Sequence, residues 1–162
     1  MLRGESSSDS PDASSRWSYH VFLSFRTEGD HIDFADNLRA SLQRKGISTF
    51  RYDQQAERGD MIWEKVQEAI EKSVVAIVLL SENYASSSWC LDELRKILDL
   101  GKPVVPVFYD VDPSDVRHQR NSFFKAFKEH EIRSEEDKLK VPKWRESLKT
   151  VAGFSGCVSK NM

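Results

Sequence analysis

Cysteine is scarce in this chain of 162 residues, and the two that occur, Cys90 and Cys157, lie far apart. Such a pair gives no disulfide framework or metal-ligand spacing, and a reducing intracellular compartment is the simplest interpretation. Long apolar runs are also missing, since the longest, residues 74–80, is too short to span a bilayer. The polar N-terminus lacks a signal-peptide core, and Leu2 stands where N-myristoylation requires glycine. We therefore expect no membrane attachment.

A charge excess is absent as well, because 24 Lys and Arg residues against 26 Asp and Glu residues leave a formal net charge of -2. We therefore expect no nucleic-acid partner. No GxGxxG, GxxxxGK[ST] or GxSxG string occurs, which removes the usual dinucleotide, P-loop and hydrolase fingerprints. The four histidines show no ligand spacing. The third predicted strand ends in Leu80-Ser81 rather than in the aspartate that a phosphoreceiver needs.

Apolar periodicity outlines one domain over residues 17–157, between a disordered leader at 1–16 and a tail at 158–162. Short apolar runs predict strands at residues 19–25, 47–50, 74–80 and 102–109. Stripes of apolar residues predict helices at residues 32–45, 62–70, 88–98, 123–127 and 144–152. Two prolines favour an edge position for the fourth strand. Residues 110–121 and 131–140 are expected as loops, and no fifth strand is evident. The alternation predicts an α/β fold with a mostly parallel sheet and helices on both faces.

The segment Ser86–Leu94 is the most informative part of the chain. Trp89 and Glu93 are four residues apart, so on a helix they lie one above the other, near the edge where open α/β sheets bind ligands. A flat ring beside a carboxylate suits a sugar joined to a cationic aromatic base. The alternative is that Trp89 covers the core and Glu93 is a solvated charge. We expect Glu93 on the exposed helix surface, where its replacement costs less than ~0.5 kcal/mol.

Two further segments follow strands and are expected at the same edge, residues 25–28 and the exposed loop at residues 52–60. Arg26 has the multi-donor geometry that clamps phosphates, and Glu57 can hydrogen-bond a ribose or a base. The alternative for Arg26 is a surface ion pair with Glu28 or Asp30, which is common and contributes little energy.

Several strings together resemble the TIR domain (Toll/interleukin-1 receptor/resistance protein), over roughly residues 18–157. The first is Tyr19-His-Val-Phe-Leu-Ser-Phe-Arg26, and Ala56-Glu-Arg-Gly59 resembles part of the second loop. The strings Ser81-Glu-Asn-Tyr-Ala-Ser-Ser-Ser-Trp-Cys-Leu-Asp-Glu-Leu94, Pro106-Val-Phe-Tyr-Asp-Val-Asp-Pro-Ser-Asp-Val-Arg117 and Lys143-Trp-Arg-Glu-Ser-Leu148 resemble the plant form of the family.

This resemblance implies a flavodoxin-like three-layer sandwich with a parallel sheet of four to five strands. Plant members are usually the signalling domain of intracellular nucleotide-binding leucine-rich-repeat immune receptors, acting in the cytoplasm or nucleus. They are similar to enzymes that cleave NAD+ or NADP+ when TIR domains self-associate, with no metal and with NAD+ as substrate rather than cofactor. The family's catalytic glutamate falls on Glu93, and its substrate-binding positions fall on Arg26, Thr27, Glu57 and Trp89.

The chain departs from the plant pattern at several positions. Thr27 stands where plant members usually carry glycine, and Asp36-Asn37 replaces a Ser-His pair used in self-association. Like-charged Asp36 residues across a symmetric contact would repel, so weak self-association is expected. Two hypotheses follow from these observations. One is an NAD+ nucleosidase that is active when oligomerised and triggers plant defence and cell death. The other is a non-catalytic TIR–TIR interaction module.

Overall fold

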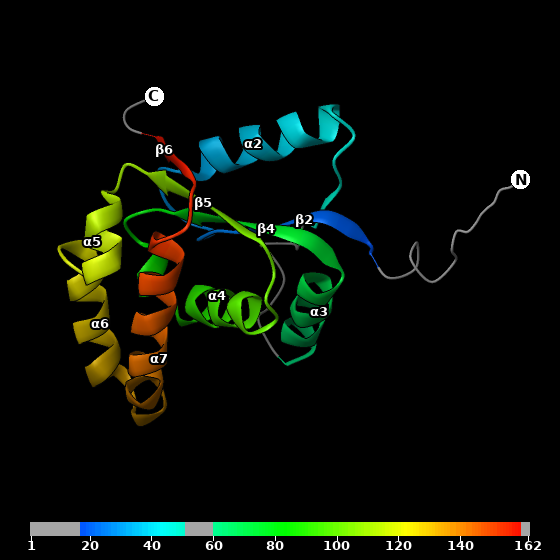
Figure 1. Cartoon of the computed structure of the whole chain (residues 1–162). Coiled ribbons are helices and arrows are strands. Elements are labelled where there is room, and N and C mark those ends of the chain that lie inside the picture. The colour runs from blue at the N-terminus through cyan, green and yellow to red at the C-terminus, as the bar shows by residue number, and fades with distance from the viewer. Residues whose placement is uncertain (1–16, 51–59, 160–162) are drawn as a thin grey trace, which may run out of the picture.

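The computed structural model describes residues 17–50 and 60–159, and within them a five-stranded parallel sheet is flanked by helices (Figure 1). The strands are β2 (Tyr19–Ser24), β3 (Thr49–Phe50), β4 (Ser73–Leu80), β5 (Val104–Tyr109) and β6 (Cys157–Ser159). Their order in the sheet is β3-β2-β4-β5-β6, and all four neighbouring pairs are parallel. This is the flavodoxin-like strand order, so the predicted fold class is confirmed.

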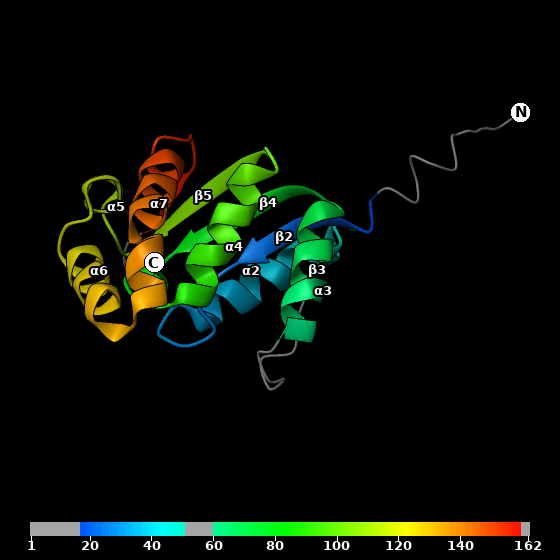
Figure 2. The ribbon, with the colours of Figure 1, turned by 90° about the horizontal axis from the view of Figure 1, so that it is seen from below.

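The helices form the two outer layers of the sandwich. They are α2 (Ile32–Arg44), α3 (Asp60–Glu71), α4 (Ser88–Asp99), α5 (Pro113–His118), α6 (Ser122–Arg133) and α7 (Glu135–Ala152), with a short 3-10 helix η1 (Tyr84–Ser86). In the view from below, α3, α4 and α7 lie in front of the sheet and α2 lies behind it (Figure 2). The sheet is therefore covered by one helix on one face and by several on the other.

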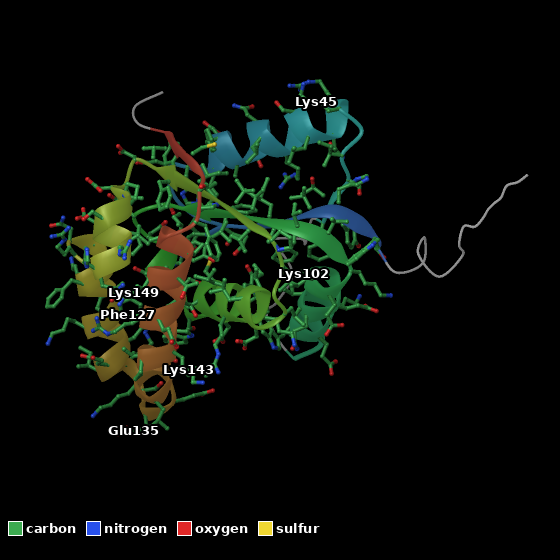
Figure 3. The ribbon with its side chains drawn as sticks, in the orientation of Figure 1. Lys45, Lys102, Phe127, Glu135, Lys143 and Lys149 are labelled. Atoms are coloured by element: carbon green, nitrogen blue, oxygen red, sulfur yellow. The ribbon has the colours of Figure 1, made fainter. Side chains whose placement is uncertain are left out.

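Side chains fill the space on both sides of the sheet (Figure 3). The larger core joins the sheet to α3, α4, α6 and α7, and its bulkiest fully buried members include Trp144, Tyr84, Phe22 and Phe127. The smaller core lies under α2 and contains a single buried residue of that helix, Ala35. The alternation along β2 divides its side chains between the two cores, so that Phe22 joins the larger one and Leu23 the smaller one.

The sheet has a fifth strand that the sequence did not reveal, and β5 is not the edge strand that its prolines predicted. β6 pairs with β5 in parallel through Val107↔Cys157 and Phe108↔Val158, so Val158 and Ser159 of the expected tail belong to the sheet. Gly156 makes this pairing possible, because a Cβ at that position would overlap the carbonyl oxygen of Pro106. β6 was missed because its apolar residues, Cys157 and Val158, form too short a run to show a strand pattern.

The two expected loops also contain helix. α5 begins where Asp112 accepts a 2.8 Å hydrogen bond from the Ser114 amide, with Pro113 in the first turn. The expected connection at 131–140 is helical except for Ser134, which accepts a 3.0 Å hydrogen bond from the Asp137 amide at the start of α7. Acidic residues in the first turn of α7 complement the helix dipole. High charge therefore marks a helix start in this region.

Two of the predicted segments lie wholly or mostly outside the part of the chain that the structure describes. The expected leader at residues 1–16 and the loop at 52–60, apart from Asp60 at the start of α3, lie outside the described residues. Among the residues that are described, no helix combines the length and apolar character needed to cross a bilayer.

Candidate functional site

The expected site lies where β2 and β4 end, which is the topological switch point of this sheet. After β4 the chain turns through η1 and enters α4, whose first turn is capped by Ser87: its hydroxyl accepts a 3.1 Å hydrogen bond from the Cys90 amide. This cap fixes the entry of α4 and thereby the positions of Trp89 and Glu93. Both cysteines of the chain, Cys90 and Cys157, are free thiols.

Glu93 is fully buried, so the prediction of an exposed helix-surface position was wrong. Its carboxylate accepts two hydrogen bonds, one from the Ser24 hydroxyl to Oε1 at 2.9 Å and one from the Trp89 indole nitrogen to Oε2 at 2.7 Å. A buried carboxylate is stable only when its oxygens are satisfied in this way. Glu93 faces inward because α4 packs it against the end of β2, on the same face as Leu94 and Ile97.

Trp89 is partly buried, and its ring is held on two sides. Its indole N–H donates to Glu93, and the ring of Trp63 on α3 meets it edge to face, with 5.2 Å between the ring centroids and 75° between the planes. The spacing argument placed Trp89 and Glu93 side by side, which the structure confirms, although it did not foresee the direct hydrogen bond. Trp63 was missed, because its role depends on how α3 packs against α4.

Ser24 and Tyr84 were also missed, and both are completely buried. The Ser24 hydroxyl lies 2.8 Å from the Tyr84 hydroxyl, which donates a 3.1 Å hydrogen bond to the Cys90 carbonyl. A signal for Ser24 was present in the sequence, since a lone hydroxyl inside an apolar strand must find a buried partner. Tyr84 had no comparable signal, because it stands in the mostly polar stretch Ser81–Ser88, outside any predicted strand.

Arg26 and Thr27 lie just beyond the end of β2, after the buried Phe25, and are both partly exposed. The ion pair expected as the alternative for Arg26 is present, with 3.4 Å between Nη2 and Oε1 of Glu28, whose side chain is 77% exposed. The Nε of Arg26 is buried and has no hydrogen-bond partner. The guanidinium of Arg26 is therefore only partly satisfied by its contact with Glu28. Glu57 lies outside the described residues.

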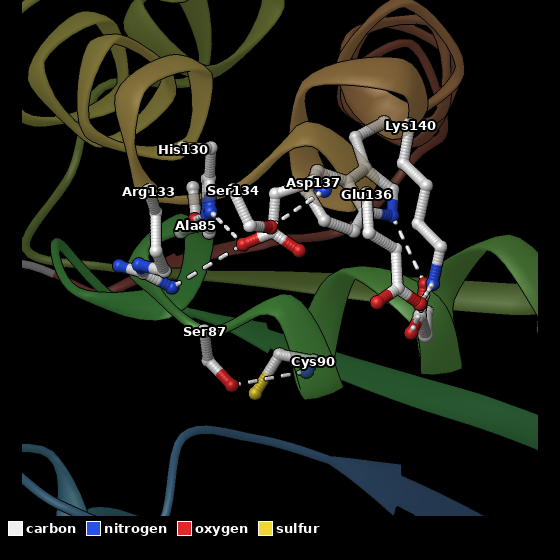
Figure 4. A network of polar contacts seen from close by, with 11 residues as sticks. Ala85, Ser87, Cys90, His130, Arg133, Ser134, Glu136, Asp137 and Lys140 are labelled. Carbon is white, nitrogen blue, oxygen red and sulfur yellow. Dashed lines mark hydrogen bonds and ion pairs between the residues drawn. The ribbon is translucent and has the colours of Figure 1, made fainter.

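A polar network behind the site ties η1 and α4 to the helical hairpin of α6 and α7 (Figure 4). The fully buried His130 contacts the Ala85 carbonyl through Nε2 at 2.7 Å, and its Nδ1 lies 3.6 Å from Oδ2 of Asp137. On α4, Asp92 accepts hydrogen bonds from the Trp144 indole at 3.1 Å and from Lys140 at 3.4 Å. The elements that carry Tyr84 and Glu93 are thus fixed from the side of α7 as well as from the sheet.

A second feature of the same edge is an open cleft of about 170 Å³, which we call the acidic cleft. It is lined by Gly29, Asp30, His31, Ser81, Glu82, Asn83, Tyr109 and Asp110. Burial lowers the pKa of His31, and the hydrogen bond between its Nε2 and the Arg26 carbonyl, at 2.5 Å, opposes that effect only in part. In the described part of the chain, no group of three or more His, Cys, Asp and Glu side chains is arranged to hold a metal ion.

Comparisons with known proteins assign the family. The family model described as "TIR domain" matches residues 18–162. The chain is 48% identical over 151 residues to TMV resistance protein N of Nicotiana glutinosa, covering 91% of this chain and 13% of that protein. It is 47% identical over 159 residues to disease resistance protein RPV1 of Vitis rotundifolia, covering 96% of this chain and 11% of that protein. The chain thus spans a small part of the length of these relatives.

The structural comparison agrees with the sequence comparisons. The TIR domains in the structure of the activated Roq1 resistosome, which directly recognises the pathogen effector XopQ, superpose with a TM-score of 0.78 and 46% sequence identity. That match covers 90% of each chain. Strand order, the strings at the ends of β2 and β4 and these matches agree, and the chain belongs to the TIR domain family.

Proposed function

We propose that this chain is a plant immune-receptor TIR domain that cleaves NAD+ to nicotinamide and an ADP-ribose product when several copies assemble. The observation that carries the proposal is the arrangement at the switch point, where a carboxylate, an indole ring and an arginine with unused donor capacity follow the ends of neighbouring strands. Phosphates, a ribose and a cationic base are the groups that such side chains recognise.

In the proposed reaction, Arg26 and Thr27 hold the diphosphate-ribose part of NAD+ or NADP+, and Trp89 faces the nicotinamide. Glu57, in the segment of the chain between β3 and α3, contributes a further contact to the ribose or the base. The N-glycosidic bond breaks with its electron pair going to the ring nitrogen, so that neutral nicotinamide leaves. Glu93 stabilises the positive charge that develops on the ribose. Water then attacks the ribose C1′ and loses a proton, or an internal nucleophile closes a ring. Glu93 is the proposed catalytic residue, and the reaction needs no metal or cofactor.

The burial of Glu93 favours dependence on assembly. In a single chain the Glu93 side chain has no exposed surface, so a substrate reaches it only after neighbouring groups move. Contacts between copies can supply that rearrangement and exclude water from the site. On α2, Asp36 and Asn37 are exposed, and Asp36 forms an ion pair with Arg39 at 3.1 Å, which offsets part of the expected repulsion. We therefore expect a domain that is monomeric when dilute and associates when concentrated or tethered through a receptor.

The second candidate function, a non-catalytic TIR–TIR interaction module, is favoured by the same burial. A carboxylate with one hydrogen bond on each oxygen can also be a purely structural link between β2 and α4. In that case the domain recruits other TIR domains without turnover.

One assay separates the two functions. The domain is incubated with NAD+ over a concentration series from dilute to crowded, and released nicotinamide is measured. We expect release that rises faster than linearly with protein concentration and that is lost in Glu93→Gln. Asp99→Asn is the matched control, because Asp99 is an exposed carboxylate on the same helix. Equal background release by all three proteins at every concentration would favour the interaction module.

A further inference from the structure

Three side chains from three elements meet in the interior beneath the proposed site: Ser24 of β2, Tyr84 of η1 and Glu93 of α4. Each of them is completely buried. The other buried side chains at the end of β2 are apolar, namely Val21, Phe22, Leu23 and Phe25. Burying a hydroxyl group in such surroundings costs free energy unless it is hydrogen-bonded. The hydrogen bonds of Ser24 and Tyr84 therefore need to be accounted for.

The hydrogen bonds run in a defined direction. Ser24 has a single hydroxyl proton, which it donates to Oε1 of Glu93 at 2.9 Å. The Tyr84 hydroxyl donates to the Cys90 carbonyl at 3.1 Å, and its oxygen lies 2.8 Å from the Ser24 hydroxyl oxygen, which fixes where Ser24 stands. Tyr84 thus supports Ser24, and Ser24 supports the carboxylate.

The other oxygen of Glu93 is held by the Trp89 indole at 2.7 Å. With Oε1 tied to the end of a strand and Oε2 tied to its own helix, the plane of the carboxylate is fixed from both sides. Loss of the Ser24 contact would remove the donor that ties Oε1 to β2, and the terminal torsion of the glutamate, which has a broad energy profile, would be less restricted.

We propose that Ser24 and Tyr84 are positioning residues that orient the Glu93 carboxylate and, through it, the indole ring of Trp89. The inference rests on the proposed nucleosidase function for its kinetic consequence, whereas its structural consequence holds for either candidate function. Neither residue contacts substrate in this proposal, and both act through Glu93.

The structural consequence is tested by NMR of the indole N–H groups in the 15N-labelled domain, with the Trp89 signal assigned from Trp89→Phe. We expect Ser24→Ala and Tyr84→Phe to shift that signal and to speed its exchange with solvent. Ser73→Ala is the control, because Ser73 is a buried serine of β4 whose hydroxyl donates to the Ala69 carbonyl instead. An unchanged Trp89 signal in both variants would overturn the proposal, whether or not the domain cleaves NAD+.

The kinetic consequence is tested on the same proteins with NAD+ at matched high protein concentration. We expect Ser24→Ala to lower kcat at least about tenfold, with KM changed less than about twofold and a smaller loss of kcat in Tyr84→Phe. Ser24→Thr retains the hydroxyl and should recover much of the lost kcat, which a general loss of packing would not allow. Wild-type kcat in folded Ser24→Ala and Tyr84→Phe would overturn the proposal while leaving the nucleosidase function intact. Absence of turnover in the wild type would refute the nucleosidase function, and the NMR result would still decide the positioning role.

Discussion

The Glu93 site and the acidic cleft lie at the same carboxyl edge of the sheet but treat their polar groups in opposite ways. At the Glu93 site, one carboxylate is withdrawn from solvent and held by two donors. In the acidic cleft, the carboxylates of Asp30, Glu82 and Asp110 are exposed and the cavity is open. The open cavity of this edge is therefore not the place where a carboxylate is buried and fixed by hydrogen bonds. An exposed carboxylate is solvated and contributes little to the free energy of folding. A buried carboxylate is costly unless neighbouring groups donate hydrogen bonds to it.

Removing Glu93 gives the largest expected effect. Glu93→Ala removes the acceptor of the Ser24 and Trp89 hydrogen bonds and opens a cavity, so the free energy of unfolding should fall by about 3 kcal/mol. This replaces the smaller cost expected for an exposed position. Urea denaturation of the wild type and the variant measures the difference. A loss below about 0.5 kcal/mol would mean that Glu93 is solvated after all, and the contrast with the cleft would disappear.

Gly29, at the mouth of the acidic cleft, should be the most sensitive cleft position. Its φ of +125° is unfavourable for other residues, and a Cβ would approach Nδ2 of Asn83 to 3.0 Å and the His31 ring to 3.1 Å. Gly29→Ala should therefore destabilise the domain by about 2 kcal/mol, and nicotinamide release per folded molecule should not change. Thermal melts and the release assay, with Gly46→Ala as an uncrowded positive-φ control, test both statements. A large loss of release would connect the cleft to the Glu93 site.

The acidic cleft should also give the domain a dependence on pH. Burial lowers the pKa of His31 from 6.5, so the folded state favours the neutral ring. Its contribution to stability is complete above pH 6.5 and is lost as the pH falls toward the lowered pKa, because the unfolded state binds the proton first. Urea denaturation across this range should show that loss in the wild type and a flatter profile in His31→Gln. Identical profiles would assign the acid sensitivity to other groups.

Neutralising the exposed carboxylates of the cleft should have the smallest effect. The double variant Asp30→Asn with Glu82→Gln should retain nicotinamide release within about twofold and stability within about 0.5 kcal/mol, because solvated charges contribute little. Side-by-side assays with Glu93→Gln give the comparison directly. If the double variant lost as much activity as Glu93→Gln, the two regions would have to be treated as one site.

The sequence predicted β2, β3, β4 and β5 and the strand–helix alternation, because those segments of the chain carry clear apolar runs and stripes. It predicted the pairing of Trp89 and Glu93 because helix geometry alone places residues four apart together. It did not predict the burial of Glu93 or the roles of Ser24, Tyr84 and Trp63, since these depend on contacts between elements far apart in the chain. β6 and the start of α7 were missed because pairing and capping, rather than periodicity, define them.

Gly156 protects the domain from contacts with other molecules, because it allows β6 to cover the edge of β5. Among the described residues, the three-residue strand β6 alone pairs with β5 on that side of the sheet. Any larger residue at 156 would push the chain away from Pro106 and leave β5, whose Val105 is already 39% exposed, as an open strand. Unpaired strands of this kind recruit strands from other molecules. Even the methyl group of alanine at this position is therefore expected to make the domain aggregate through the unpaired edge of β5.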